Sequence, residues 1–203
     1  MYNMDTRENT KRFRSIEFFL LALVGKCGLD SLYALRESAG LQPGAIGPVM
    51  RQLEALNLIK RSEPGARMRR EILLTDEGSA FLESAWAQCQ RDYPEMESVL
   101  RASMVAYIMA GSSEAANCLA AAAKTRQRKA EEARSKASYL DPRSLELLEE
   151  YAWMRLEAEA DRRDSEVQTL MKIRDRLLAR SKQSKDLRKR ASNPDKPQTG
   201  ETL

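Results

Sequence analysis

Apolar and polar positions divide the chain into two patterned regions and two polar ends. Between residues 15 and 92 the spacing changes from helical to strand-like and back, whereas residues 93–180 keep a helical spacing throughout. Residues 1–14 and 181–203 are polar and show no period, so we expect a flexible basic arm and a disordered basic tail. The pattern predicts a mainly α protein with two folded regions.

Three helices are expected before the first strand. Residues 16–24 are apolar nearly all round, which indicates a helix buried on several sides and ended by Gly28. A short amphipathic helix follows and closes at Gly40. Pro43 opens a third helix over 43–56, since a first-turn N–H is unpaired in any case. The apolar residues of this third helix form one stripe: Ile46, Val49, Met50, Leu53 and Leu56.

After Asn57 the spacing becomes that of strands. Residues 58–62 and 67–74 flank a Pro-Gly pair, which supplies the fixed φ and the positive φ of a tight turn. Thr75 then caps a fourth helix. Three helices, a β-hairpin and a further helix follow the order of a winged helix-turn-helix domain. In that arrangement helix 43–56 enters the major groove and the hairpin forms the wing.

Charge is concentrated on this hairpin. The chain has 34 Lys and Arg against 30 Asp and Glu, and this excess is too mild to indicate nucleic acid by itself. Between residues 60 and 70, however, five basic residues accompany a single acid, Glu63. One interpretation is a wing that contacts phosphates, and the alternative is a solvated edge strand that carries cations for solubility. Because pattern and charge agree, we favour the phosphate contact.

Residue usage argues against catalysis. The chain contains no histidine, which removes Ser/His/Asp and Cys/His nucleophile arrangements and His-ligated zinc. Cys27, Cys89 and Cys118 are far apart and odd in number, as suits buried thiols in a reducing compartment. No convergent acid/base set is visible. We expect no enzyme activity, no cofactor and no metal site.

The apolar run at residues 18–24 is too short for a membrane helix, which needs roughly 18 residues. Basic residues precede it at 11–14, as in a signal peptide. Glu17 separates the two segments, however, and Lys26 stands where a small cleavage-site residue is needed. A buried first helix explains the run better, so we expect a cytoplasmic protein with no membrane partner.

Residues 93–180 are expected to form three helices, the last of them long. Pro94 starts the first, residues 114–138 form the second, and Asp141-Pro142 opens a third that runs to about residue 180. A helix of roughly 55 Å, at ~1.5 Å per residue, outruns a small domain. We therefore expect part of its apolar stripe to pack on a second chain, the alternative being an intramolecular three-helix bundle. The expected dimerisation residues are Leu145, Leu148, Leu156, Val167, Leu170 and Leu177. Tyr151 and Trp153 either line an effector pocket or belong to the core.

Three motifs lie in the N-terminal region: Leu29-Asp-Ser-Leu-Tyr-Ala-Leu35, Leu41-Gln-Pro-Gly-Ala-Ile-Gly-Pro-Val-Met-Arg-Gln-Leu-Glu-Ala-Leu-Asn-Leu-Ile59 and Arg69-Arg-Glu-Ile-Leu-Leu-Thr-Asp-Glu-Gly78. They resemble, in order, the second helix, the recognition-helix signature and the wing strand of the PadR-like winged-helix regulators. The family pattern around the recognition helix is Pro-Gly-x-x-x-Pro followed by Leu-Glu. Two positions depart from it: Gly47 replaces a tyrosine, and Gln42 replaces a serine.

The resemblance implies a homodimeric transcription factor, commonly a repressor, whose C-terminal helices dimerise. Some members of the family sense small aromatic or lipophilic molecules, which implies a small lipophilic effector as a partner. We therefore expect a double-stranded DNA-binding regulator, the alternative being a helical interaction module whose winged domain binds protein. The residues expected to contact DNA are Tyr33, Gln42, Gly44, Ala45, Gly47, Arg51, Lys60, Arg61, Arg67 and Arg69.

Overall fold

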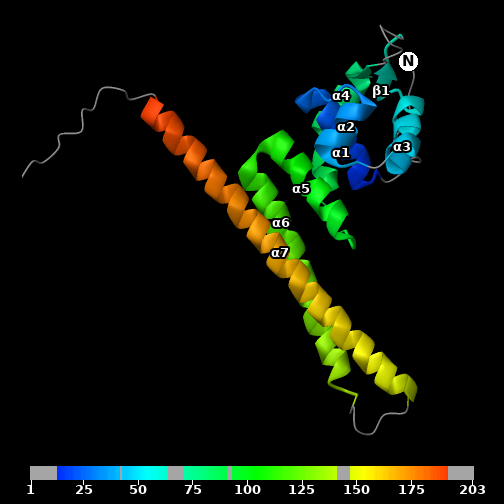
Figure 1. Ribbon diagram of the computed structural model, residues 1–203, viewed down its shortest axis with the longest axis vertical. Coiled ribbons are helices and arrows are strands. Elements are labelled where there is room, and N and C mark those ends of the chain that lie inside the picture. The colour runs from blue at the N-terminus through cyan, green and yellow to red at the C-terminus, as the bar shows by residue number, and fades with distance from the viewer. Residues whose placement is uncertain (1–12, 42, 64–70, 91–92, 141–146, 192–203) are drawn as a thin grey trace, which may run out of the picture.

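A computed structural model of the chain describes residues 13–41, 43–63, 71–90, 93–140 and 147–191. The protein is mainly helical, with one small antiparallel hairpin (Figure 1). The elements are α1 (Ser15–Cys27), α2 (Leu32–Ala39), α3 (Pro43–Ala55), β1 (Ile59–Arg61), β2 (Ile72–Leu74), α4 (Asp76–Ala85), the 3₁₀ helix η2 (Trp86–Cys89), α5 (Met96–Ala110), α6 (Ser112–Ala137) and α7 (Leu147–Ala191).

The first two helices end where the sequence predicts. Gly28 and Gly40 follow α1 and α2 with φ of 67° and 63°, a left-handed conformation that glycine adopts at little cost. The start of α2 differs from the expectation, because Ser31 caps it by accepting a hydrogen bond from the Ala34 N–H at 3.2 Å. The helix therefore begins at Leu32, and Leu29, the first residue of the motif that resembles this helix, precedes it.

The strand prediction is confirmed over a shorter length. β1 and β2 are antiparallel, with Ile59 opposite Leu74 and Arg61 opposite Ile72. The Ile72 N–H also donates to the Asp30 carbonyl at 2.6 Å, which joins the hairpin to the segment between α1 and α2. The tip, residues 64–70, lies outside the described residues.

The close approach of α4 to the hairpin explains why the third motif ends in Leu74-Thr-Asp-Glu-Gly78. Thr75 caps α4 by accepting from the Gly78 N–H at 2.9 Å, and its own hydroxyl donates to the Asn57 carbonyl at 2.6 Å. At Gly78 a Cβ atom would stand 1.9 Å from the Leu58 carbonyl oxygen. Only glycine lets the first turn of α4 pack this closely against the start of β1.

Replacing Gly78 with alanine is expected to lower the free energy of unfolding by about 3 kcal/mol, because the added methyl overlaps backbone that cannot move aside. Urea unfolding followed by circular dichroism measures this change. Gly44→Ala is the matched control, because no atom lies within 4 Å of a Cβ there. Equal stability of the two variants would contradict the packing described.

Helix α1 forms the centre of the N-terminal core, as its all-round apolar pattern predicts. Phe18, Leu20 and Leu21 are each at most 1% exposed. Phe18 stacks on Phe81 of α4 at 5.7 Å between ring centroids, and Phe13 packs against both rings. The apolar run at residues 18–24 therefore belongs to a buried helix, as the sequence predicts. Among the described residues, no helix is both long enough and apolar enough to cross a membrane.

Helix α5 joins the two halves of the protein. Its Ala102 and Val105 belong to the same buried cluster as α1, whereas Val99 packs with Leu119 and Leu170 of the C-terminal half. Beyond α5, α6 and α7 lie side by side in antiparallel orientation and form a long hairpin that projects from the N-terminal region (Figure 1).

Helix α7 is longer than expected. It continues to Ala191, so the prediction that the helix ends near residue 180 and that a disordered tail begins at 181 is wrong for residues 181–191. That segment contains neither proline nor glycine and consists mostly of good helix formers. The 45 residues of α7 span roughly 67 Å at ~1.5 Å per residue.

Part of the apolar stripe of α7 packs within its own chain, which corrects the expected dimer contact at Leu170. Leu170 is fully buried against α5 and α6. Val167 and Leu177 pack against the same cluster, and Leu156 packs against Ala130 and Ala133 of α6. The alanine-rich face of α6 allows this close packing. Of the remaining expected residues, Leu148 is 81% exposed, and Leu145 lies outside the described residues.

One buried cation ties this hairpin to the start of α5. Arg126 of α6 is 1% exposed, and its Nε donates to Glu166 Oε2 of α7 at 2.7 Å. Its Nη2 donates to the Tyr93 carbonyl at 3.1 Å, in the segment before α5. Glu166 also accepts from Arg162 at 3.2 Å and from Arg163 at 3.4 Å. A single guanidinium thus holds three segments together.

Candidate nucleic-acid interface

Helix α3 has one buried face and one open face. Ile46, Val49, Met50 and Leu53 are each at most 2% exposed and fix α3 against the N-terminal core. On the opposite face, Gly44, Ala45, Pro48 and Arg51 are exposed. The first turn of this face carries only small side chains, so another molecule could approach its backbone closely.

Gly47 and Arg51 are neighbours on α3. An added Cβ at Gly47 would meet Arg51 Nη1 at 3.8 Å, and it would meet no other atom within 4 Å. The guanidinium therefore lies over the glycine, one helical turn before Arg51. Where the resembling family has a tyrosine, this chain presents a cation above bare backbone.

The hairpin carries further basic residues. Lys60 of β1 is exposed. Arg61, the next residue, forms an ion pair with Glu54 of α3. Arg61 therefore also joins β1 to α3, a role that the sequence does not reveal because Glu54 and Arg61 lie on different elements.

Helix α2 contributes Tyr33, which is 67% exposed. Arg36, one turn later, is also exposed. Arg36 is not among the contact residues expected from the sequence, although its spacing of three from Tyr33 places it on the same helix face. Three expected contact residues, Gln42, Arg67 and Arg69, lie outside the described residues.

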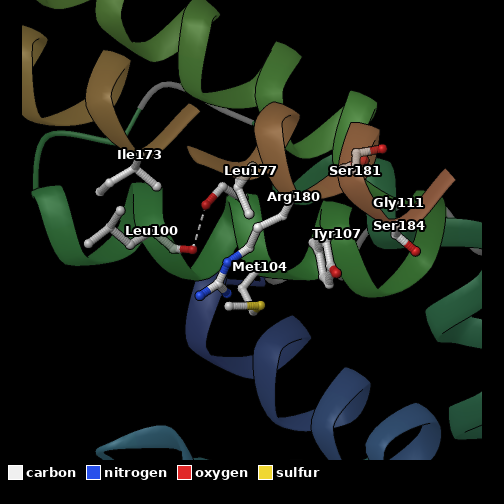
Figure 2. Close-up of a pocket in the computed structure, with 11 residues that line it drawn as sticks. Leu100, Met104, Tyr107, Gly111, Ile173, Leu177, Arg180, Ser181 and Ser184 are labelled. Atoms are coloured by element: carbon white, nitrogen blue, oxygen red, sulfur yellow. Dashed lines mark hydrogen bonds between the residues drawn. The ribbon is translucent and has the colours of Figure 1, made fainter. Parts of the chain in front are cut away.

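A separate groove of about 910 Å³ lies between α5 and the C-terminal part of α7 (Figure 2). Its apolar floor includes Leu100, Met104 and Leu177, and the Arg180 side chain extends over Met104. Tyr151 and Trp153, for which the sequence left open an effector pocket or the core, do not line this groove. Tyr151 is 66% exposed, and Trp153 is half-buried.

The described residues offer little reactive chemistry. Within them, no group of three or more Cys, Asp or Glu side chains is placed to hold a metal ion. Burial raises the pKa of the Cys118 thiol to about 11, and nearby Glu114 adds to the shift, so this thiol is protonated at neutral pH.

In comparisons with known proteins, no family model matches the chain, and no curated protein or solved structure matches it.

Proposed function

We propose that the protein is a DNA-binding transcriptional regulator whose residues 15–92 form a winged helix-turn-helix domain. The observation that carries the proposal is the open face of α3, which presents Arg51, together with the exposed Lys60 on β1, a strand that the Arg61–Glu54 ion pair joins to α3. Elements α1, α2 and α3 followed by an antiparallel hairpin and α4 have the order of such a domain. The resemblance to PadR-like regulators, carried by motifs on α2, α3 and β2, favours the same function.

In this proposal α3 enters the major groove of duplex DNA. Its small first-turn residues, Gly44 and Ala45, let the helix approach base edges, and the unpaired first-turn N–H groups favour nearby phosphates. Arg51 is long enough to reach a base edge or a flanking phosphate. Lys60 meets the adjacent backbone, together with Arg67 and Arg69 from the segment that follows β1 in the sequence. The regulator acts as a homodimer, commonly a repressor in the resembling family.

Replacing Lys60 with alanine is expected to weaken binding to all duplexes alike. The loss of one phosphate contact lowers the slope of log affinity against log salt by about 0.9. Arg51→Ala is instead expected to change the sequence selected from a random duplex pool, at a discrimination of ~1–3 kcal/mol for the position it reads. Fluorescence anisotropy at several salt concentrations measures the first effect, and binding-site selection measures the second.

The control is Arg128→Ala, which removes an equal charge from an exposed position on α6. This variant is expected to keep the wild-type salt slope and the selected sequence. Equal losses in Arg128→Ala and Lys60→Ala would show non-specific attraction only. If the wild type binds no duplex at about 50 mM salt, where phosphate contacts are strong, the winged domain is not a DNA-binding domain.

A further inference from the structure

The first three turns of α7 expose a row of apolar side chains. Leu147, Tyr151 and Met154 are 81%, 66% and 55% exposed. Ala158, four residues later, is exposed too. At 3.6 residues per turn these four positions share one face, about half a turn around α7 from Leu156 and the other residues that pack on α6. Large apolar side chains clustered at this exposure are typical of an interaction surface.

The spacing of this row is that of a coiled-coil seam. The steps from Leu147 to Tyr151, Met154 and Ala158 are four, three and four residues, so Leu147 and Met154 occupy d positions and Tyr151 and Ala158 occupy a positions. The next d position is Asp161, which ends the seam. The helix needs no partner to form, because Leu156 and Ala160 already hold it against Ala130 and Ala133 of α6. Pairing would therefore bury the seam without the cost of ordering a helix.

The charges beside the seam identify the partner and its direction. The g positions are acidic, Glu150 and Glu157, and the following e positions are basic, Arg155 and Arg162. In a parallel pair, a g residue faces the e residue five positions later on the other chain, so Glu150 meets Arg155 and Glu157 meets Arg162. In an antiparallel pair, g faces g and e faces e, so that like charges meet. A second copy of this chain in parallel orientation is thus the complementary occupant.

The pair between Glu150 and Arg155 of the second copy is free to form. Within the described part of the chain, no ion pair is found for Glu150 or Arg155, and both are exposed. Arg162 already bonds Glu159 and Glu166 in its own chain, and its hydrogen bond lowers the pKa of Glu159. Glu150 and Arg155 therefore determine the orientation most directly.

We infer that the face of α7 formed by Leu147, Tyr151, Met154 and Ala158 pairs with the same face of a second copy as a short parallel coiled coil. The inference names the dimer surface of the proposed function and rests on that part of it. A parallel pair directs both copies of α7 the same way. In each chain the N-terminal region lies toward the C-terminal part of α7 (Figure 1). Parallel pairing would therefore place both α3 helices toward the same end of the dimer.

Site-specific disulfide formation tests the pairing and its direction in the full-length protein. In a Cys27→Ser background, which removes the exposed native thiol, Leu147→Cys and Ala158→Cys are each expected to form a covalent dimer under mild oxidation. Glu149→Cys, exposed on another face of the same turn, is the control and is expected to stay monomeric on denaturing gels. An antiparallel pair would crosslink only when the Leu147→Cys and Ala158→Cys chains are mixed, and that result overturns the inference.

Charge exchange supplies the second test. Sedimentation velocity of Glu150→Arg is expected to show a dimer dissociation constant about tenfold weaker, because each arginine then faces Arg155 of the partner. Adding Arg155→Glu to the same chain is expected to restore the wild-type constant. A wild type that remains monomeric up to ~100 μM, or a dimer unaffected by Glu150→Arg, overturns the inference. DNA binding is measured separately, so a dimer that ignores DNA would contradict only the proposed function.

Discussion

Replacing Glu166 with alanine is expected to lower the free energy of unfolding by about 3–5 kcal/mol. The variant leaves the Arg126 guanidinium buried at 1% exposure without its counter-charge, and the desolvation of an unpaired charge is the dominant cost. Tyr93 and Ala122 still accept hydrogen bonds through their carbonyls, but they carry no formal charge. Urea unfolding monitored at 222 nm measures the change.

Two controls separate this effect from a general loss of charge. Glu132→Ala removes the acid of an exposed ion pair with Arg128 on the same hairpin, and its expected cost is below about 1 kcal/mol. Replacing both buried partners, Arg126→Met with Glu166→Leu, is expected to recover most of the stability, since no charge is then left unpaired. A loss below ~1 kcal/mol in Glu166→Ala would show that Arg126 remains solvated.

The N-terminal region could be predicted closely because its signals are local. Gly28, Gly40, Pro43 and Thr75 each begin or end an element through the conformation or hydrogen bond of that one residue. The hairpin follows from the change of spacing after Asn57. The motif glycine, Gly78, is visible in the sequence, but its reason is a 1.9 Å approach to Leu58 that only the packed structure shows.

The candidate DNA-contacting surface could be predicted in part. The outward positions of Gly44, Ala45 and Arg51 follow from the single apolar stripe on α3, because residues off a buried stripe face solvent. The pairing of Arg61 with Glu54 could not be predicted, since it depends on how β1 crosses α3. A count of charges alone would assign every basic residue of the hairpin to a contact with DNA phosphate, including Arg61.

The C-terminal half was harder, because a stripe of apolar residues does not show what covers it. Leu156 and Leu170 have the spacing expected of either a dimer seam or an intrachain bundle, and the structure shows the second. The seam at Leu147, Tyr151 and Met154 is short and ends at Asp161. It is therefore hard to distinguish in the sequence from the longer apolar stripe that contains Leu156 and Leu170. Arg126 lies in a run of charged residues that is typical of a solvated face, and yet it is buried.

The second large effect is expected at Leu170, which packs against α5 and α6. Leu170→Glu is expected to destabilise the packing of α5, α6 and α7 by at least ~4 kcal/mol. The carboxylate would be introduced at a fully buried position among Val99, Leu119 and Ala123. Arg126, which donates to the Ala122 carbonyl of the same cluster, is already paired with Glu166. The expected result is loss of much of the helical signal and of the cooperative transition, measured by circular dichroism during thermal unfolding.

A dimer-interface role for Leu170 predicts a different outcome for the same variant. A leucine that packs only on a second chain would, when replaced by glutamate, give a monomer that keeps its helical signal. Gln168→Glu, at an exposed position two residues earlier on α7, controls for the added charge and is expected to unfold like the wild type. A helical, cooperatively unfolding monomer of Leu170→Glu would contradict the intrachain packing. Loss of structure in Leu170→Glu alone would place its partners in the same chain, and would leave the outer face of α7 as the surface available to a second copy.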